Sequence, residues 1–288
     1  MARPAVDVVL PFGGRDDELA PLLSRLGRLR RGAADRVIVA DNRRGGGGAP
    51  GDGVEVVPAA GERSPAFARN RGAAAGGAQW LVFLDADVEP EADLLDRYFE
   101  PAPGERTAVL AGALRTEAPA DGRAPAAARY AHARGFLDAR RVAGLGRWAF
   151  AQTANCAVRR AAFQAVGGFT EGIRAGEDAD LCWRLAAAGW EMEARAGARA
   201  VHRPRQTVRG LIGQMAVHGG AAGWLERTWP GSFPPASRAG LAAHCTRQLG
   251  RGLAGLARGD VEAVVSLLDP VAFGAYEAGR LGRNRPRR

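Results

Sequence analysis

The chain has 288 residues, 47% of them hydrophobic, which is enough to bury a large core in one domain or in two closely joined halves. Its three cysteines are an odd number without a short metal-binding spacing, so neither a disulfide framework nor a zinc cluster is expected. The net charge is +9, but the arginines are scattered rather than clustered with aromatic residues, so nucleic acid is not the expected partner. Nucleotide diphosphates or an acidic membrane surface would suit this charge.

The first residues lack the apolar stretch of a signal peptide. No segment approaches the roughly 18 apolar residues of a membrane-spanning helix. We therefore expect a cytoplasmic protein, and the charge also allows peripheral contact with the inner face of a membrane.

Strand and helix patterns alternate through the first hundred residues. Apolar, mostly β-branched runs predict four strands, at 6–10, 36–40, 54–57 and 80–84. Leucines or small residues at helical spacing predict two helices, at 18–29 and 65–78. Strands separated by helices form a parallel sheet with both faces covered. Three of these strands end in residues able to bind a ligand: Pro11-Phe12, Asp41-Asn42 and Asp85-Ala86-Asp87.

The middle of the chain is less regular. We expect a short helix at 91–99 and a strand at 108–114. Residues 117–129 are expected to form a mobile loop, of the kind found in active-site lids, with a helix beginning near its end. From 155 to 202 the pattern predicts a strand, a helix, a glycine turn at 167–168, a helix at 178–188 and a final strand at 198–201. The glycine run at 45–48 favours a flexible loop over a phosphate cradle, because no helix start follows it.

Beyond residue 202 the sequence predicts a helical region. Helices are expected at 208–228 and 237–257, followed by a third segment at 260–282 that Asp269-Pro270 breaks. The basic tail at 283–288 is expected to be disordered. The arginines and tryptophans of this region suit packing against the rest of the chain, another subunit or an acidic membrane surface.

Asp85 and Asp87 follow a run of five apolar residues, so two carboxylates stand where a buried strand leaves its sheet. Successive strand side chains face opposite ways, but a turn at this point would let both reach one hard divalent cation. Capping of the next helix, or a place in a turn, explains the pair alone equally well.

Glu177, Asp178 and Asp180 form a second acidic group, at the start of an expected helix. Acidic residues there favour the helix dipole, and Asp178 or Asp180 is a candidate N-cap. The catalytic alternative is that one carboxylate takes a proton from an attacking hydroxyl group.

His202 and Arg69 are the remaining candidates. A lone histidine is more often structural, but His202 ends the final strand, where an imidazole can complete a metal site. Arg69 lies in the helix before the aspartate strand. It is either a solvated arginine or, if that helix borders a nucleotide pocket, a donor fork for a base carbonyl or a phosphate.

The order of these motifs resembles that of family-2 glycosyltransferases with the GT-A fold, over roughly residues 5–205. Segments 6–11 and 37–42 are similar to the family's first two strands, 68–72 to its Arg-Asn helix and 83–87 to its metal-binding doublet. Segments 158–160, 166–169 and 176–181 resemble the part that carries the catalytic base, and 200–202 the late histidine. The resemblance implies an α/β fold of the GT-A type, Rossmann-like, with a mostly parallel sheet flanked by helices and a C-terminal helical extension.

The resemblance also implies an activity. An inverting, hexosyltransferase-like enzyme would move a sugar from a nucleotide-diphosphate sugar, expected to be a UDP-sugar, to a hydroxyl-bearing acceptor. It implies Mn²⁺ or Mg²⁺ held by Asp87, with Asp85 directly or through water and with His202 as a further ligand. Asp178 would be the base, and Glu177 would orient it or the acceptor. The implied donor contacts are Pro11, Phe12, Asp41, Arg69, Asp85 and Ala86.

We divide the expected structure into three parts. Residues 1–100 would form the nucleotide-sugar-binding half of the GT-A domain, and 101–205 the half that binds the acceptor and carries the base. Residues 206–288 would form the helical extension with the basic tail. Loops that include 117–150 would shape the acceptor site.

Two departures from the family pattern touch the base and ribose pocket. Phe12-Gly13-Gly14-Arg15 follows the first proline, and Arg43-Arg44 follows Asp41-Asn42 in place of small polar residues. Two other functions remain open. One is a nucleotidyltransferase acting on a sugar phosphate, for which the glycine-rich segment after the first strand is short. The other is a non-catalytic nucleotide-sugar-binding or interaction protein, which the joint presence of Asp85, Asp87, Asp178 and His202 disfavours.

Overall fold

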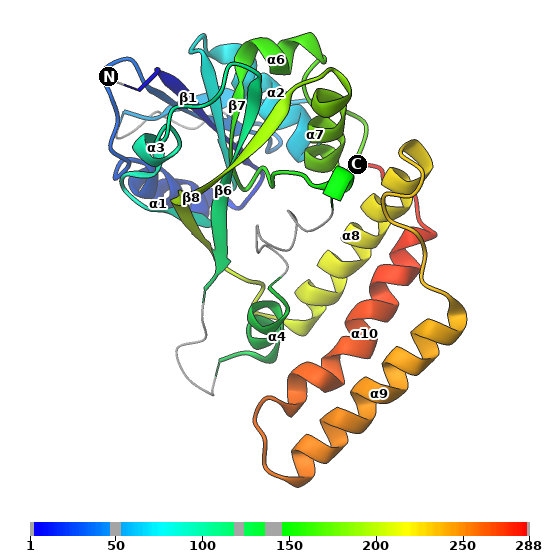
Figure 1. Ribbon diagram of the computed structural model, residues 1–288. Helices are drawn as coiled ribbons and strands as arrows, with labels where there is room; N and C mark the ends of the chain where they lie inside the picture. The colour runs from blue at the N-terminus through cyan, green and yellow to red at the C-terminus, as the bar shows by residue number, and fades with distance from the viewer. Residues whose placement is uncertain (1–2, 47–52, 118–123, 136–145, 287–288) are drawn as a thin grey trace. The chain divides into compact units, whose positions relative to one another are not determined.

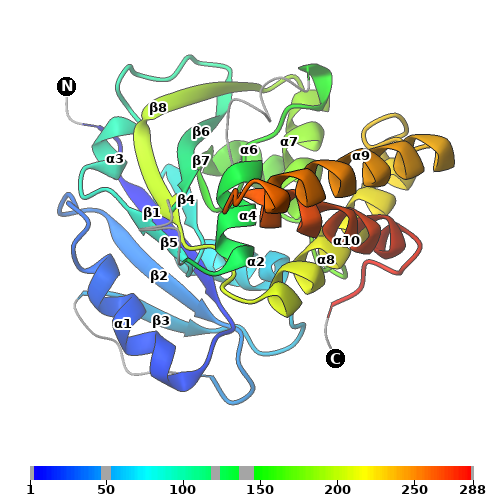
Figure 2. The ribbon, with the colours of Figure 1, turned by 90° about the horizontal axis from the view of Figure 1, so that it is seen from below.

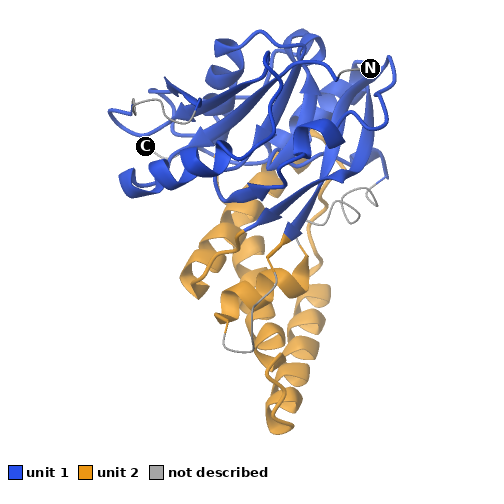
Figure 3. Ribbon diagram, turned by 90° about the vertical axis from the view of Figure 1, so that its left-hand side faces the viewer, with its two compact units in different colours: residues 1–115, 137–202, 285–288 blue, residues 116–136, 203–284 orange. Residues whose placement is uncertain are grey.

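The computed structural model describes residues 3–46, 53–117, 124–135 and 146–286. The chain forms two compact units (Figure 3). Unit 1 comprises residues 1–115, 137–202 and 285–288, and unit 2 comprises 116–136 and 203–284.

The described residues of unit 1 are built around an eight-stranded sheet (Figure 1). Its strands stand in the order β3-β2-β1-β4-β7-β6-β8-β5. Their bounds are β1 Val6–Phe12, β2 Arg36–Asp41, β3 Glu55–Pro58, β4 Trp80–Leu84, β5 Val88–Pro90, β6 Thr107–Thr116, β7 Asn155–Arg159 and β8 Glu191–His202.

The sheet is parallel in its first half and antiparallel where the later strands join. β3, β2, β1 and β4 pair in parallel, as expected for strands separated by helices. β7 pairs antiparallel with both β4 and β6, and β5 pairs antiparallel with β8. The α/β fold class with flanking helices is confirmed.

Helices cover both faces of this sheet (Figure 2). The helices of unit 1 are α1 Asp16–Leu26, α2 Pro65–Ala75, α3 Leu94–Arg97, α6 Arg160–Ala165 and α7 Glu177–Ala187, with a 3₁₀ turn, η1, at Gly146–Trp148. The leucines of α1 and α3 pack with Val8, Leu10 and Trp80 in the main core. On the other face Phe83 of β4 meets Phe163 and Phe169 at ring-centroid distances of 5.7 and 5.0 Å.

The sequence determines the placement of α2 in two ways. Ser64 caps the helix by accepting a hydrogen bond from the backbone N–H of Phe67 at 3.2 Å, and Pro65 occupies the first helical position. A Cβ at Gly72 would lie 2.5 Å from a methyl group of Val9. The glycine therefore lets α2 approach β1 closely enough to bring Arg69 to the edge of the sheet.

Unit 2 is helical in its described part. Its helices are α4 Ala126–Arg134, α8 Val208–Thr228, α9 Arg238–Ala257 and α10 Ala263–Arg280. The bounds of α8 match the sequence expectation. Its core contains Tyr130 of α4, Leu211 and Met215 of α8 and Ala272 of α10. No helix in the described part of the chain combines the length and apolar character needed to span a membrane.

The predicted break at Asp269-Pro270 is wrong, because α10 continues through Pro270. Proline removes one helical hydrogen bond, which costs about 3 kcal/mol in an isolated helix. Here the preceding residue is held by its neighbours. The buried carboxylate of Asp269 accepts a hydrogen bond from the Tyr130 hydroxyl at 2.8 Å and pairs with His244 of α9. These tertiary contacts keep the helix continuous.

Candidate active site

The carboxyl ends of β1, β2 and β4 meet at one edge of the sheet, because these three strands are parallel neighbours. Phe12 of β1 lies beside Asp41 of β2 in the strand register. After β4 the chain turns, and the backbone N–H of Val88 donates a hydrogen bond to the carbonyl oxygen of Asp85 at 3.1 Å. The Asp85–Asp87 segment is therefore a turn and not a helix cap.

Arg69 joins two of the predicted site residues. Its guanidinium donates to an oxygen of Asp85 at 2.5 Å and to an oxygen of Glu177 at 2.6 Å. Arg69 is only 2% exposed, so the reading of a solvated arginine is wrong. Burial lowers the pKa of this guanidinium, but the two carboxylates outweigh that effect and raise the pKa above its ordinary value. Arg69 is thus a fixed positive charge between the end of β4 and the start of α7.

Asp178 follows Glu177 in the first turn of α7, whose N-cap is Gly176. The N-cap reading of Asp178 or Asp180 is therefore wrong, whereas the placement of acidic residues in the first turn is confirmed. Burial and the charge of neighbouring Glu177 raise the pKa of Asp178 to about 7. A carboxylate with that pKa accepts a proton near neutral pH and is suited to act as a general base.

Polar contacts fix the loop that leads into α7. Asn70 of α2 donates to the carbonyl oxygen of Phe169 at 3.0 Å and accepts from the N–H of Phe169 at 3.0 Å. Glu62 accepts from the N–H of Gly172 at 2.8 Å. Asp180 accepts from the hydroxyl of Thr170 at 2.7 Å. Asp180 is therefore a structural member of the acidic group.

Asp87 and His202 are brought together by strand pairing. β5 pairs antiparallel with β8 so that Val88 lies opposite His202. As a result, Nε2 of His202 lies 3.5 Å from a carboxylate oxygen of Asp87. His202 is 9% exposed, and its Nδ1 is buried without a hydrogen-bond partner.

The side chains of Asp87 and His202 suit two ligand positions of a divalent cation, with a bound substrate and water at the other positions. In the described ranges, no group of three or more histidine, cysteine, aspartate or glutamate side chains could hold a metal ion. Mg²⁺ sites in phosphate-binding enzymes use one or two carboxylates and complete the coordination with substrate phosphates and water. The carboxylate of Asp87 matches such a partial ligand set, and the imidazole of His202, 3.5 Å away, would add one nitrogen ligand to it.

The remaining predicted donor contacts surround the end of β2. Asp41 is fully buried, and its carboxylate accepts from Nε and Nη2 of Arg43 at 2.8 and 2.6 Å. The same guanidinium lies 5.0 Å from the centroid of the Phe12 ring. Pro11 pairs with Ala40 in the β1–β2 register. The carbonyl oxygen of Ala86 accepts a hydrogen bond from Arg25 at 2.6 Å.

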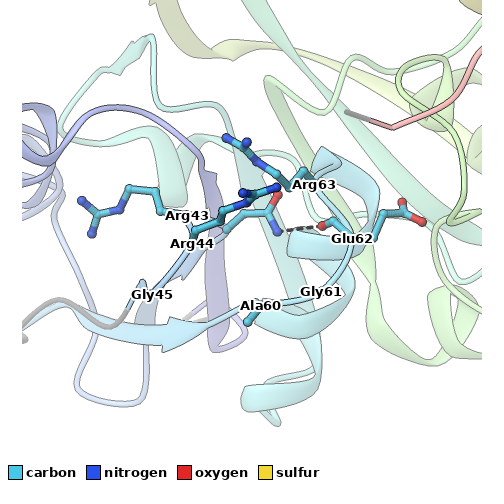
Figure 4. A pocket seen from close by; sticks show the side chains of 8 residues that line it. Arg43, Arg44, Gly45, Ala60, Gly61, Glu62 and Arg63 are labelled. Carbon is cyan, nitrogen blue, oxygen red and sulfur yellow. Dashed lines mark hydrogen bonds between the residues drawn. The ribbon is translucent and has the colours of Figure 1, made fainter. Parts of the chain in front are cut away.

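A pocket of about 360 Å³ adjoins this region (Figure 4). Its walls are two segments, one following β2 and one between β3 and α2, with lining residues Asn42, Arg43, Arg44, Gly45, Ala60, Gly61, Glu62 and Arg63. Parts of the expected flexible loop at 45–48 and of the expected acceptor loops at 117–150 lie outside the described residues.

Three contributors to the site have no clear signal in the sequence pattern. β5 is only three residues long, too short for a periodic pattern, yet it aligns Asp87 with His202. Asn70 and Glu62 lie far in sequence from the loop that they hold. The proximity of Asn70 to Arg69 in the Arg-Asn motif was the one available signal.

The mixed eight-stranded sheet with helices on both faces defines an α/β architecture of the GT-A type. The family model for glycosyltransferase-like family 2 matches residues 8–220, and the chain belongs to this family.

Individual relatives agree with this assignment. The chain is 31% identical over 271 residues to proteins named pre-mycofactocin glycosyltransferase from two strains of Mycobacterium tuberculosis, covering 88% of this chain and 54% of theirs. The chain thus spans about half the length of the curated relatives it matches.

Solved structures share the fold. A mannosyltransferase from Pyrobaculum calidifontis, in complex with GDP-mannose and Mn²⁺, superposes with a TM-score of 0.57 at 15% identity over 95% of this chain and 74% of its own. Glucosyl-3-phosphoglycerate synthase from Mycobacterium tuberculosis superposes with a TM-score of 0.52 at 17% identity over 78% of this chain and 79% of its own.

Proposed function

We propose that this chain is an inverting glycosyltransferase that moves a sugar from a nucleotide-diphosphate sugar to a hydroxyl-bearing acceptor with the help of a divalent cation. The observation that carries the proposal is the group formed by Arg69, Asp85 and Glu177, with Asp178 beside it. This group joins the sheet edge where the α/β fold binds ligands to a carboxylate that is able to take up a proton. Membership in glycosyltransferase-like family 2 supports the same class of reaction.

Asp178 is the proposed base. The acceptor hydroxyl loses its proton as its oxygen attacks the anomeric carbon from the face opposite the leaving diphosphate, which inverts that carbon. A base with a pKa of about 7 is ionised often enough at neutral pH and still holds the proton well. Glu177, fixed by Arg69 at 2.6 Å, would orient Asp178 or the acceptor.

Asp87 and His202 are the proposed protein ligands of Mn²⁺ or Mg²⁺, with Asp85 beside them directly or through water. When bound, the cation would neutralise the charge that develops on the leaving diphosphate. The imidazole and carboxylate lie 3.5 Å apart, a separation that suits two ligands of one cation. The Mn²⁺ complex of the Pyrobaculum mannosyltransferase supports this proposal by analogy of fold.

The donor nucleotide would lie along the ends of β1, β2 and β4. Pro11, Phe12 and Asp41 are the proposed contacts of the base and ribose, and Asp85 and Ala86 the proposed contacts nearer the diphosphate. Arg69 is engaged with two carboxylates, so its main proposed task is to position them. A direct contact of Arg69 with the donor stays a prediction.

A panel of nucleotide sugars tests the proposed function. Purified protein with Mn²⁺ is screened by thermal shift, and each stabilising donor is then assayed for release of nucleoside diphosphate with and without hydroxyl acceptors. We expect at least one donor to bind and to be hydrolysed slowly without acceptor. Failure of every nucleotide-diphosphate sugar to bind contradicts the proposal, and release of pyrophosphate from a nucleoside triphosphate would favour the nucleotidyltransferase reading.

Peripheral membrane contact also stays a prediction. Helix α9 carries Arg238, Arg247 and Arg251 without an acidic residue, and Leu249, Leu253 and Leu256 are exposed on it. Co-sedimentation with anionic vesicles at low salt tests the contact.

A further inference from the structure

Arg43 forms a bidentate ion pair with the carboxylate of Asp41. Nε and Nη2 of the guanidinium donate to the two separate oxygens of the carboxylate at 2.8 and 2.6 Å. The backbone N–H of Arg43 adds a third hydrogen bond at 3.1 Å. Asp41 has no exposed surface, so hydrogen-bond donors of the protein, the guanidinium of Arg43 among them, take the place of water around its carboxylate.

The same guanidinium also covers an aromatic ring. Its central carbon lies 5.0 Å from the centroid of Phe12, and Phe12 and Asp41 are paired in the β1–β2 register. The guanidinium therefore lies over the Phe12 ring while its edge binds Asp41. We call these two residues the Asp41–Phe12 seat.

The Asp41–Phe12 seat favours a planar group that carries two parallel N–H donors on one edge. A single planar partner can bind both oxygens of a carboxylate only if it offers two parallel N–H donors side by side. Guanine offers them at its ring N1 and its exocyclic N2. Uracil presents one N–H between two carbonyl groups, while adenine and cytosine place an acceptor nitrogen next to their amino group. Among the common bases, only guanine repeats the donor pattern of the guanidinium.

We propose, on the basis of the proposed function, that the donor is a guanosine-diphosphate sugar and that guanine replaces the guanidinium of Arg43 on the Asp41–Phe12 seat. A guanosine-diphosphate sugar differs from the UDP-sugar expected from the sequence. Guanine would restore both hydrogen bonds to the buried carboxylate and the stacking on Phe12. Uracil would restore one hydrogen bond and turn a carbonyl oxygen toward the second carboxylate oxygen, which is unfavourable.

The surroundings allow Arg43 to leave the seat. Its Nη1 already lies 2.5 Å from an oxygen of Asp16, a residue whose side chain is almost fully exposed. Asp16 can keep the displaced guanidinium paired outside the seat.

Calorimetric titration of the full chain with GDP and with UDP, each with Mn²⁺, tests the inference. We expect GDP to bind about 10- to 100-fold more tightly than UDP, the range for loss of a hydrogen bond to a buried charged group. Asp41→Asn keeps one acceptor oxygen and should reduce the preference to severalfold or less. Arg43→Ala removes the competitor for the seat, so GDP affinity should rise while the preference remains.

Arg36→Ala is the matched control, because Arg36 pairs with Glu55 at the opposite end of β2 from Asp41 and should leave the preference unchanged. Circular dichroism confirms that each variant is folded, and the wild-type comparison remains decisive if one is not. Equal or tighter binding of UDP to the wild type overturns the guanine assignment and leaves the proposed function standing. A guanine preference that Asp41→Asn retains overturns the seat. Binding of neither nucleotide, together with the absence of sugar transfer, contradicts the proposed function itself.

Discussion

At the scale of single residues, the site keeps a carboxylate where its ionisation is costly. Asp178 is partly withdrawn from water and lies next to a second carboxylate, Glu177, so its pKa rises to about 7. Arg69 compensates Glu177 by direct contact at 2.6 Å. The arrangement leaves Asp178 as the group that gains most from taking up a proton, which is the property a general base requires.

The first prediction concerns this base. Asp178→Asn should lower sugar transfer by at least about a thousandfold while donor binding changes less than severalfold, because the amide cannot accept the proton. In the wild type, kcat/KM should rise tenfold per pH unit below pH 7 and level off above it. Initial rates across pH 5–9, with donor affinity measured by titration, check both expectations. Parallel loss of transfer and donor binding would contradict the assigned role.

The same pKa has a consequence for stability. Because folding raises the pKa of Asp178 above its ordinary value, the folded state holds this proton more tightly than the unfolded state does. The contribution of Asp178 to stability therefore falls as pH rises from about 4 to about 7 and then stays constant. Asp178→Asn should raise the melting temperature relative to wild type more at pH 8 than at pH 5. An equal difference at both pH values would speak against the raised pKa.

At the scale of elements, α2 determines where α7 begins. Asn70 binds both backbone polar groups of Phe169 and also donates to Glu171 at 2.8 Å, so the loop before α7 is tied to the helix that carries Arg69. A small displacement of that loop would move Glu177 and Asp178 together. In catalysis, displacement by about 1 Å can cost a hundredfold in rate.

The second prediction tests this tie. Asn70→Ala should reduce kcat by about tenfold or more with little change in donor affinity, because the two proposed catalytic carboxylates shift while the ends of β1 and β2 stay in place. The control is Arg71→Ala on the same helix, since the exposed Arg71 side chain lies over Phe67 and away from the loop. Steady-state kinetics distinguish the two variants. A larger loss in Arg71→Ala than in Asn70→Ala would refute the role of the tie.

The third prediction concerns the packing of α8 on α10. A Cβ at Gly219 would lie 1.8 Å from the carbonyl oxygen of Tyr276, and one at Gly279 would lie 2.1 Å from that of Ala216. The two helices therefore approach closely because glycines face each backbone. Gly219→Ala should lower the free energy of unfolding by about 3 kcal/mol, since the helices must separate to admit the methyl group.

Gly213 of α8 provides the control for that substitution. A Cβ there meets nothing within 4 Å, so Gly213→Ala should be neutral or stabilising by up to about 1 kcal/mol through helix propensity. Urea denaturation followed by circular dichroism measures both changes. Similar stabilities for the two variants would show that the close contact is absent in solution.

At the scale of the whole molecule, the elements with a clear period were predictable from the sequence and the contacts between distant segments were not. The bounds of β4 and α8 agree with their expected ranges because apolar runs and helical spacing are local signals. The antiparallel entry of β7, the partnership of Arg69 with Glu177 and the continuity of α10 through Pro270 depend on tertiary packing. Sequence motifs thus select the candidate residues of the site, whereas the ion pairs that hold these residues together depend on tertiary contacts that the sequence pattern does not reveal.

The last prediction applies to the whole protein. A donor and a cation that bind only the folded chain should stabilise it by about 2.7 kcal/mol at a ligand concentration of 100 times Kd. For a chain of this size the melting temperature should rise by about 5–10 °C. Because Asp87 is a proposed metal ligand, Asp87→Ala should lose the part of the rise that requires Mn²⁺ and keep the part seen with EDTA. Thermal melts of both proteins, with and without donor and Mn²⁺, measure the four shifts. If the Mn²⁺-dependent rise is the same in both proteins, Asp87 is not a ligand, and if the wild type shows no such rise, donor binding does not depend on a cation.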